Sequence, residues 1–534
     1  MALNHKVIFG MKLRQFRERA GLSLTDLSSR TGLSTSYLTE IEHGKKYPKT
    51  EKIARIAEHL GKSYDDLVSL RLDEQLSPLS DFLGSPVLNG FPYHLFGISP
   101  AQVLELLTRQ PAEASALVNA LLAIAEQYNI TVEHLYRSAL RSYQELHGNY
   151  FPDIERAVDE FVRAQRIKQS PRPSYEQLLA LIEQHFGYSL DHRRLSNHPR
   201  LARFRSVLVT KPRQGPLLLV NPALSELQQR FILAREIGYR VLDLKERAMT
   251  SAPERVDSFE QVLNDFKASY FAGALLVNRD LLLADMKKFF GLDRWRPERL
   301  RALLERYDVT PEIFMYRLTE LVPAFFGIRL HFLRFNNEAG EYRLVKHLNM
   351  SQVLIPGGTG VNEHYCRRWL AIRILQNLNL SGNESPRSGE TGRGETGRGK
   401  IGSSKTDGGK TENGKNDNGK AKGKTDSGKT SSEPRIEAQL SRFVDTDARY
   451  LCLAMARRLT LTPSAASSVS VGFRFDDVVE RTVKFARDPS ITSMDIDGTC
   501  ERCRLDPCLE RAAAPVLFEL QRSRRQIEAE LATL

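Results

Sequence analysis

Three cysteines near the end of the chain have a spacing that suits a soft metal centre. Cys500, Cys503 and Cys508 form a Cys-x2-Cys-x4-Cys sequence within nine residues. Thiolates ligate both zinc and iron–sulfur centres, and three of them leave one ligand position to be filled. Cys366, in the sequence Cys-Arg-Arg-Trp, is the preferred fourth ligand. The spacing alone does not distinguish zinc from an iron–sulfur cluster.

The other cysteine, Cys452, is the second candidate for the fourth ligand. It lies in the apolar sequence Tyr-Leu-Cys-Leu-Ala, for which we predict a helix and a core position. The alternative for the cluster itself is three reduced structural cysteines without metal. Arg502, Arg504 and Arg511 lie beside the cluster in sequence and would offset the charge of four thiolates.

A second group of residues, near the N-terminus, suits contact with DNA. Ser23 is predicted to cap a helix over 24–30 that stops at Gly32, and Ser34 to cap a helix over 35–42. Two short helices joined by a glycine turn place the second in a major groove. Base edges could be reached by the leading polar residues of this helix: Thr35, Ser36, Tyr37, Thr39 and Glu40. Phosphates could be contacted by the lysines that follow it, Lys45 and Lys46.

Residues 10–70 closely resemble the Cro/repressor type of helix-turn-helix, the XRE family. The resemblance implies an ion pair between Arg17 of the first helix and Glu42 of the recognition helix. The family usually has Gln where this chain has Leu24. The alternative is a helical bundle without a DNA role, but the caps, glycines and basic residues favour DNA binding.

The sequence around Glu236 is similar to the zinc-peptidase motif His-Glu-x-x-His of the ImmA/IrrE type. That motif places two imidazoles one helical turn apart on zinc, with Glu as the base. Here Arg235 and Tyr239 stand in the two His places, and Lys267 stands in the place of the third ligand, a Glu. Two cations in place of zinc ligands repel the metal, so we expect no peptidase activity.

The same three residues suggest another chemistry. Arg235, Tyr239 and Lys267 could bind an anionic ligand, because cationic groups in a cleft suit phosphate or carboxylate. The alternative is that they pair with Glu236 or point to solvent.

Hydrophobic periodicity predicts the elements that must position these residues. The expected fold class is mainly α with smaller mixed α/β parts. The predicted elements after residue 200 are strands over 204–210 and 216–220, helices over 225–245 and 259–276, more helix to about 325, a hairpin of 328–335 and 342–348, a strand over 468–475, and a terminal helix from about 515.

The chain divides into five predicted parts. These are a helix-turn-helix domain (1–75), a helical connector that is expected to dimerise (76–168), a degenerate peptidase-like α/β domain that is the expected sensing domain (169–356), a cysteine-rich domain split into 357–380 and 435–534, and a Gly/Lys-rich insert (381–434). The insert is predicted to be disordered because it has too few apolar side chains to offset its ordering entropy.

Composition limits the function classes. The chain has 534 residues, and 77 Lys and Arg against 65 Asp and Glu give +12, which favours an anionic partner such as nucleic acid. Five cysteines exclude a disulfide scaffold, and no apolar run reaches the 18 residues of a membrane span. We therefore expect a cytoplasmic protein without a membrane partner.

The order of these parts resembles the short-chain fatty acyl-CoA regulators, bacterial transcription factors of carbon metabolism. The resemblance implies an acyl-CoA-responsive central region and a four-cysteine iron–sulfur site, so we prefer a [4Fe–4S] cluster to zinc. The expected function is a non-enzymatic, homodimeric regulator that binds an operator in double-stranded DNA and responds to short-chain acyl-CoA. Two alternatives are a metal-dependent stress peptidase acting on a repressor and a redox sensor with the cluster as input.

Overall fold

We describe the protein from a computed structural model. It describes residues 2–69, 91–98, 131–167, 172–211, 214–251, 256–353, 363–380, 433–444 and 448–533, with isolated positions between 103 and 124 and at 355 and 446. The predicted Gly/Lys-rich insert up to residue 432 and most of the connector before residue 131 lie outside these residues. The chain forms two compact units, the first of residues 1–332, 347–353 and 471–488, the second of residues 333–346, 354–470 and 489–534.

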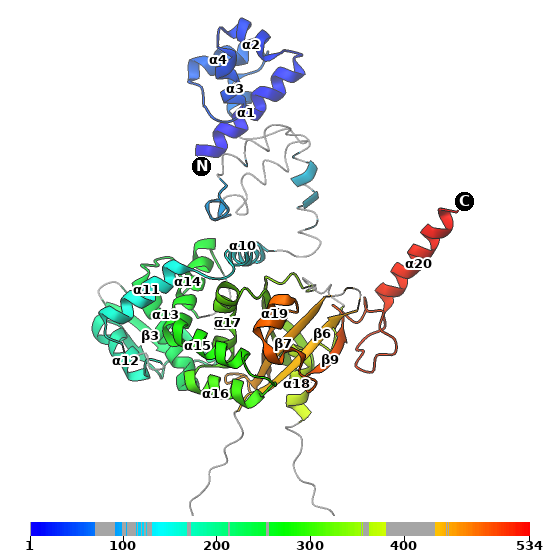
Figure 1. Cartoon of the computed structure of the whole chain (residues 1–534). Coiled ribbons are helices and arrows are strands. Elements are labelled where there is room, and N and C mark those ends of the chain that lie inside the picture. The colour runs from blue at the N-terminus through cyan, green and yellow to red at the C-terminus, as the bar shows by residue number, and fades with distance from the viewer. Residues whose placement is uncertain are drawn as a thin grey trace, which may run out of the picture. The chain divides into compact units, whose positions relative to one another are not determined.

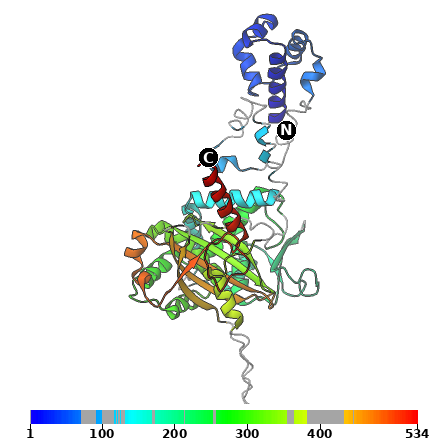
Figure 2. The same ribbon diagram turned by 90° about the vertical axis from the view of Figure 1, so that its right-hand side faces the viewer.

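Five helices form the N-terminal bundle of the first unit (Figure 1). They are α1 (Ala2–Arg19), α2 (Leu24–Thr31), α3 (Thr35–Glu42), α4 (Thr50–His59) and α5 (Tyr64–Val68). Ser23 caps α2, Gly32 ends it in the left-handed conformation, and Ser34 caps α3, as the sequence predicts. Figure 2 shows α1 beside the shorter helices, which share a core that includes Leu13, Leu27 and Leu38.

A glycine sets the distance between α1 and α3. A Cβ at Gly10 would lie 2.2 Å from the carbonyl oxygen of Ile41, which is closer than a carbon can approach an oxygen to which it is not bonded. Glycine is therefore required where α1 crosses the end of α3, and this crossing fixes how the recognition helix is held.

The helices and strands of the predicted connector and peptidase-like parts follow a short 3-10 helix, η2 (Tyr93–Phe96). They are α10 (Val132–Leu146), α11 (Pro152–Ala164), α12 (Tyr175–Ala180), the π-helix η3 (Leu181–His185), β1 (Ser189–Asp191), β2 (Ser206–Lys211), β3 (Gln214–Val220), α13 (Glu226–Val241), α14 (Phe259–Leu276), α15 (Arg279–Phe290), α16 (Pro297–Tyr307) and α17 (Pro311–Phe326). The predicted strand pair and long helices are confirmed.

The strand β1 is one of the elements that the sequence did not predict, as are β6 and β9 of the second sheet. It pairs parallel with β3, and β2 pairs antiparallel with β3, which gives the order β1-β3-β2. Three residues are too few for a period-two pattern to be recognised. Beside this sheet, α13 and α14 pack closely, since a Cβ at Gly238 would lie 3.0 Å from the carbonyl oxygen of Ala268.

A six-stranded sheet has the order β5-β4-β8-β7-β6-β9. Its strands are β4 (Leu330–Glu338), β5 (Glu341–Asn349), β6 (Arg435–Phe443), β7 (Arg449–Arg458), β8 (Ala466–Arg474) and β9 (Thr492–Ile496), and the boundary between the two units falls within β4, β5 and β8. The predicted hairpin and the predicted strand over 468–475 are confirmed as β4, β5 and β8.

In the second unit, α18 (Leu370–Leu380) packs on β6 and β7, and α20 (Val516–Leu531) follows the cysteine loop (Figure 1). The short helices α19 (Asp477–Thr482) and η4 (Lys484–Arg487) belong to the first unit. The terminal helix agrees with the prediction.

The helix predicted around Cys452 is wrong, because this residue lies in β7. Seven consecutive residues of that strand, from Tyr450 to Ala456, are buried. A strand that is buried on both faces loses its polar alternation, and its apolar run then looks like a buried helix. The core position predicted for Cys452 is correct.

The fold class is mainly α with smaller α/β parts, as predicted. Among the described helices, none is both long enough and apolar enough to cross a bilayer.

Candidate nucleic-acid interface and cysteine site

The recognition helix α3 divides its residues between the core and the surface. Leu38 and Ile41 are fully buried in the bundle. On the other side, Thr35 and Ser36 are exposed, and the other predicted contact residues are partly exposed: Tyr37, Thr39 and Glu40. The exposed side therefore presents short polar side chains at the start of the helix, where a major-groove helix contacts bases.

The lysines that follow α3 lie at the edge of the same surface. Lys45 and Lys46 are exposed. The Lys46 ammonium lies 2.6 Å from a carboxylate oxygen of Glu40 and 5.7 Å from the centre of the Tyr37 ring. The negative charge of Glu40 is thus neutralised by Lys46, which reduces its repulsion of a phosphate backbone.

A buried ion pair holds α1 to the end of α3. Arg17 donates from Nε to Glu42 Oε1 at 2.7 Å and from Nη2 to Glu42 Oε2 at 2.9 Å, and its Nη1 donates to the carbonyl of Leu22. The hydrogen bond with Glu42 raises the pKa of Arg17. The predicted pair is therefore present. Leu24, which stands where the family usually has Gln, packs against the core of the bundle.

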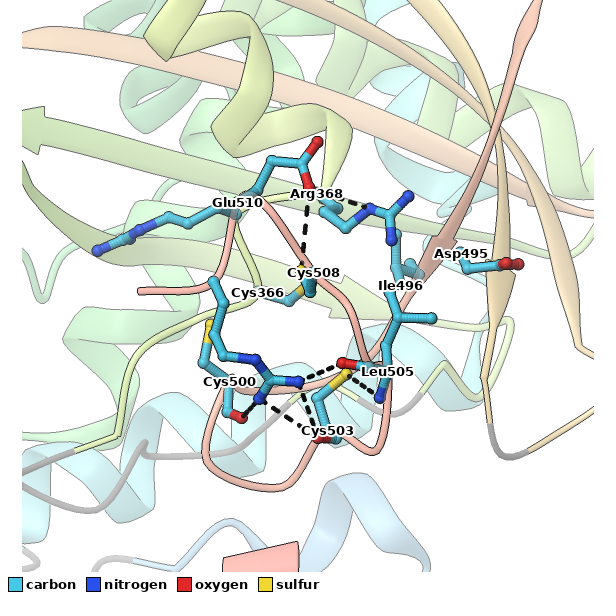
Figure 3. A pocket seen from close by; sticks show the side chains of 11 residues that line it. Cys366, Arg368, Asp495, Ile496, Cys500, Cys503, Leu505, Cys508 and Glu510 are labelled. Atoms are coloured by element: carbon cyan, nitrogen blue, oxygen red, sulfur yellow. Dashed lines mark hydrogen bonds and ion pairs between the residues drawn. The ribbon is translucent and has the colours of Figure 1, made fainter. Parts of the chain in front are cut away.

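The second unit brings the four predicted metal ligands to one pocket (Figure 3). Cys366, Cys500, Cys503 and Cys508 all line it, the first three buried and Cys508 partly exposed. Cys452 does not line this pocket. The four cysteines predicted as ligands therefore line the same pocket.

A short backbone pairing brings Cys366 to the cysteine loop. Cys366 N–H donates to the Gly498 carbonyl at 3.2 Å, and Cys500 N–H donates to the His364 carbonyl at 2.8 Å. These two bonds flank an antiparallel bridge between Tyr365 and Thr499. Two segments more than 130 residues apart are thereby held in register.

A buried carboxylate, that of Glu501, secures this pairing. No sequence motif had singled out this residue. Glu501 is 5% exposed and accepts the backbone N–H of His364 at 2.9 Å. Its Oε1 also lies 2.7 Å from the Nδ1 of the same histidine. The carbonyl of Glu501 accepts the N–H groups of Leu517 and Phe518, so the first turn of α20 is tied to the same residue.

The loop around the sulfurs is held by main-chain hydrogen bonds. Arg511 donates to the carbonyls of Cys500 at 3.0 Å and Cys503 at 3.4 Å. Two amides point at sulfur: Leu505 N–H donates to Cys503 Sγ at 3.4 Å, and Ala512 N–H donates to Cys500 Sγ at 3.3 Å. Amide donors of this kind stabilise the negative charge of thiolates that bind a metal.

The cations at the pocket are not all those that the sequence suggested. Arg502 pairs with Glu363, and Arg504 donates to a backbone carbonyl. The arginines that line the pocket are Arg367, Arg368 and Arg511.

Burial favours the protonated form of two thiols of this pocket, Cys366 and Cys503. It raises the pKa of Cys366 to about 12 and that of Cys503 to about 11. Charge on Cys500 and Cys503 adds to the rise at Cys366, because the sulfurs are near neighbours. In the part of the chain that the structure describes, no three His, Cys, Asp or Glu side chains already form a closed metal-binding group.

The peptidase-like motif on α13 is engaged in ion pairs. Arg235 lies 3.1 Å from Asp265, and the Tyr239 hydroxyl donates to the same carboxylate at 3.3 Å. Glu236 is fully buried and accepts two hydrogen bonds from Arg247, at 2.6 and 2.7 Å. Arg235 is therefore paired, but with a carboxylate other than Glu236.

Lys267 is partly buried on α14, two residues beyond Asp265. The three residues proposed for an anion thus lie on two helices that pack together. Asp265 and Arg247 were not predicted as site residues, because neither stands at a position of the peptidase pattern.

Comparison with known proteins identifies two domains. Residues 8–70 match the helix-turn-helix domain family, and residues 190–319 match the IrrE N-terminal-like domain of the M78 peptidases. These matches confirm the two domain types that the sequence suggested.

Two curated relatives that match about three fifths of this chain are named as regulators. The chain is 25% identical over 345 residues to the HTH-type transcriptional regulator RamB of Mycobacterium tuberculosis, covering 62% of this chain and 68% of RamB. It is 22% identical over 349 residues to the propionyl-CoA carboxylase regulator of Cereibacter sphaeroides, with the same two coverages. A Mycobacterium tuberculosis transcriptional regulator of known structure aligns with 71% of this chain and 93% of its own, at 16% identity and a TM-score of 0.44.

The contacts of Glu501 predict that Cys366 becomes more exposed when the Glu501 carboxylate is removed. In metal-free protein, Glu501→Ala should raise the rate at which iodoacetamide labels Cys366 at pH 8 by at least about tenfold. The reason is that the raised pKa leaves little thiolate at pH 8, and exposure lowers the pKa toward its ordinary value. In the unsubstituted chain, labelling should instead rise as the pH approaches 12.

Mass spectrometry of the labelled peptides measures this rate. Glu528→Ala on the exposed surface of α20 is the matched control and should leave the rate unchanged. Equal rates for Glu501→Ala and Glu528→Ala would show that Glu501 does not hold Cys366 in place.

Proposed function

We propose that the chain is a DNA-binding transcriptional regulator that joins a helix-turn-helix domain to an IrrE-like domain and is controlled by short-chain acyl-CoA. The single observation that carries DNA binding is the exposed polar start of α3 on a helix held by the Arg17–Glu42 pair. We further propose that the protein is not an enzyme and acts in the bacterial cytoplasm, where its DNA partner is.

We propose that the active form is a homodimer. One helix-turn-helix reads only a few base pairs, and regulators of this type pair two half-sites about 34 Å apart. In the connector, Leu117, Leu121 and Ile124 recur at helical spacing and are each at least half exposed. Exposed apolar residues of this kind suit a contact with a second copy of the same segment, and light scattering at micromolar concentration measures the oligomeric state.

The DNA proposal predicts two kinds of loss. Ser36→Leu with Thr39→Leu should weaken binding to the selected operator about 100-fold, because two base-facing polar groups are replaced. Lys45→Ala and Lys46→Ala should weaken all sequences alike and reduce the slope of log affinity against log salt by about 0.9 each.

Fluorescence anisotropy with operator and scrambled duplexes measures both. Glu58→Ala, exposed on α4 away from the recognition helix, is the control that should bind as the parent chain does. Unaltered operator affinity in the Ser36 and Thr39 variant would remove α3 as the reading helix.

We propose that the effector's anionic groups bind at Arg235, Tyr239 and Lys267. These side chains lie on α13 and α14, and Arg235 is already engaged by the Asp265 carboxylate. An anionic effector would therefore compete with Asp265 for Arg235. That one relative is named a propionyl-CoA carboxylase regulator agrees with an acyl-CoA effector.

This competition predicts opposite effects of two substitutions. Asp265→Asn should strengthen the binding of short-chain acyl-CoA, since it removes the competing charge, whereas Lys267→Ala should weaken it about tenfold. Calorimetry with propionyl-CoA measures both, and Lys288→Ala, exposed on α15, is the control. A change of the same sign in both variants, or none, would place the effector elsewhere.

For the cysteine site we propose a [4Fe–4S] cluster held by Cys366, Cys500, Cys503 and Cys508, with Zn²⁺ as the alternative. The donor set fits either, since four thiols line one pocket with two amides directed at sulfur. A single zinc needs sulfurs within about 4 Å of one another, because Zn–S bonds are about 2.3 Å long. The preference for the cluster comes from the resemblance of the chain to the acyl-CoA regulators. When bound, such a cluster supplies a redox-active or structural centre.

Each of the four cysteines should therefore be required. Replacing any one of them with Ser should remove the centre and make residues 436–533 more sensitive to protease, whereas Cys452→Ser, in the buried strand β7, should retain it. Iron, zinc and sulfide content with the visible spectrum of anaerobically purified protein measures this. Metal lost with Cys452→Ser and retained with Cys366→Ser would show the ligand set to be wrong, and absence of both metals would refute the site.

A further inference from the structure

The residues at the peptidase-like motif do not fit a zinc ion. Arg235 and Tyr239 stand at the two histidine positions, and Lys267 stands at the third ligand position. The remaining acid, Glu236, is fully buried and needs a cationic partner, because an unpaired buried carboxylate is strongly destabilising. The question is which group supplies that positive charge.

Arg247 supplies it from the segment that follows α13. Its guanidinium donates to both oxygens of Glu236, at 2.6 and 2.7 Å. Its guanidinium carbon also lies 3.8 Å from the centre of the Tyr239 ring. The guanidinium thus contacts two positions of the motif at once, the Glu that serves as the base in the peptidases and the second histidine position, which is Tyr239 here.

The same segment covers the edge of the small sheet. In the order β1-β3-β2, β2 is an edge strand, and its Leu208 N–H donates to the Met249 carbonyl at 2.8 Å. Ser251 N–H donates to the Ser206 carbonyl at 3.1 Å, and Thr250 forms an antiparallel bridge with Val207. These are the main-chain bonds by which an added peptide strand would bind an open edge.

The segment is also fixed at Glu246, just before Arg247. The Asn264 side chain on α14 donates to the Glu246 carbonyl at 2.9 Å, and Ser258, which caps α14, donates to the Glu246 carboxylate at 2.8 Å. Contacts at Glu246, Arg247, Met249, Thr250 and Ser251 thus hold the end of residues 243–251 on α13, α14 and β2. We call these residues the closing segment.

We propose that the closing segment is a built-in occupant of the peptidase-like site. Arg247 takes the electrostatic role of the metal beside Glu236, and residues 249–251 take the place of a peptide along β2. The two features that a peptidase needs, an acid free to act and an open strand beside it, are both used by the chain itself.

The first test measures whether the ion pair of Arg247 with Glu236 holds the closing segment against β2. Hydrogen exchange of the full chain should show the amides of Leu208 and Ser251 exchanging about 100-fold faster in Arg247→Met, with residues 2–69 and α17 unchanged. Arg240 is an exposed arginine at the end of α13, and Arg240→Met is the matched control that should exchange as the parent chain does. Unchanged protection in Arg247→Met would overturn the proposal.

A double variant separates charge pairing from general damage. Adding Glu236→Gln to Arg247→Met removes the unpaired buried charge and should restore most of the protection. Protection that stays as low in the double variant as in Arg247→Met would show that Arg247 acts by packing and not as the partner of Glu236.

The second test rebuilds the ligands. Arg235→His, Tyr239→His and Lys267→Glu together should take up no zinc beyond that of the parent chain while Arg247 is present, and one additional zinc per chain once Arg247→Met is added. Elemental analysis after dialysis measures this. Equal uptake with and without Arg247, including none in either variant, would show that Arg247 does not hold the place of the metal.

Discussion

A buried carboxylate with a satisfied partner holds each functional region of this protein. Glu42, Glu236 and Glu501 are all at most 5% exposed. Their partners are Arg17, Arg247 and the backbone and ring of His364. A buried charge without partners costs several kcal/mol, so each carboxylate fixes the position of the segment that satisfies it. The recognition helix, the closing segment and the fourth cysteine are positioned in this way.

The three pairs differ in what they connect. Arg17 and Glu42 are 25 residues apart and join two helices of one small bundle, so local helix formation brings them together. Arg247 and Glu236 join a helix to the segment that follows it. Glu501 and His364 are 137 residues apart, with the Gly/Lys-rich insert between them in the sequence. A centre bound by all four cysteines would add a covalent link across that separation and reduce the entropy of the long loop.

The helices were predicted well because their signals are local. Ser23, Gly32 and Ser34 mark the ends of α2 and α3, and apolar residues at helical spacing mark α13 and α14. The same reasoning failed at Cys452, where a strand buried on both faces has no polar alternation. It also missed β1, which is too short to show a pattern and exists because β3 offers it parallel partners.

The sequence by itself determined which residues have the chemistry: the four cysteines, the polar start of α3, and a peptidase motif without its metal ligands. Each of these is a matter of residue type and short spacing. Only the tertiary structure decided their partners, namely Asp265 for Arg235, Arg247 for Glu236, and Glu501 for the segment that carries Cys366. The physical reason is that a charged side chain has many possible partners along a chain. Burial selects one of them through the desolvation that the whole fold imposes.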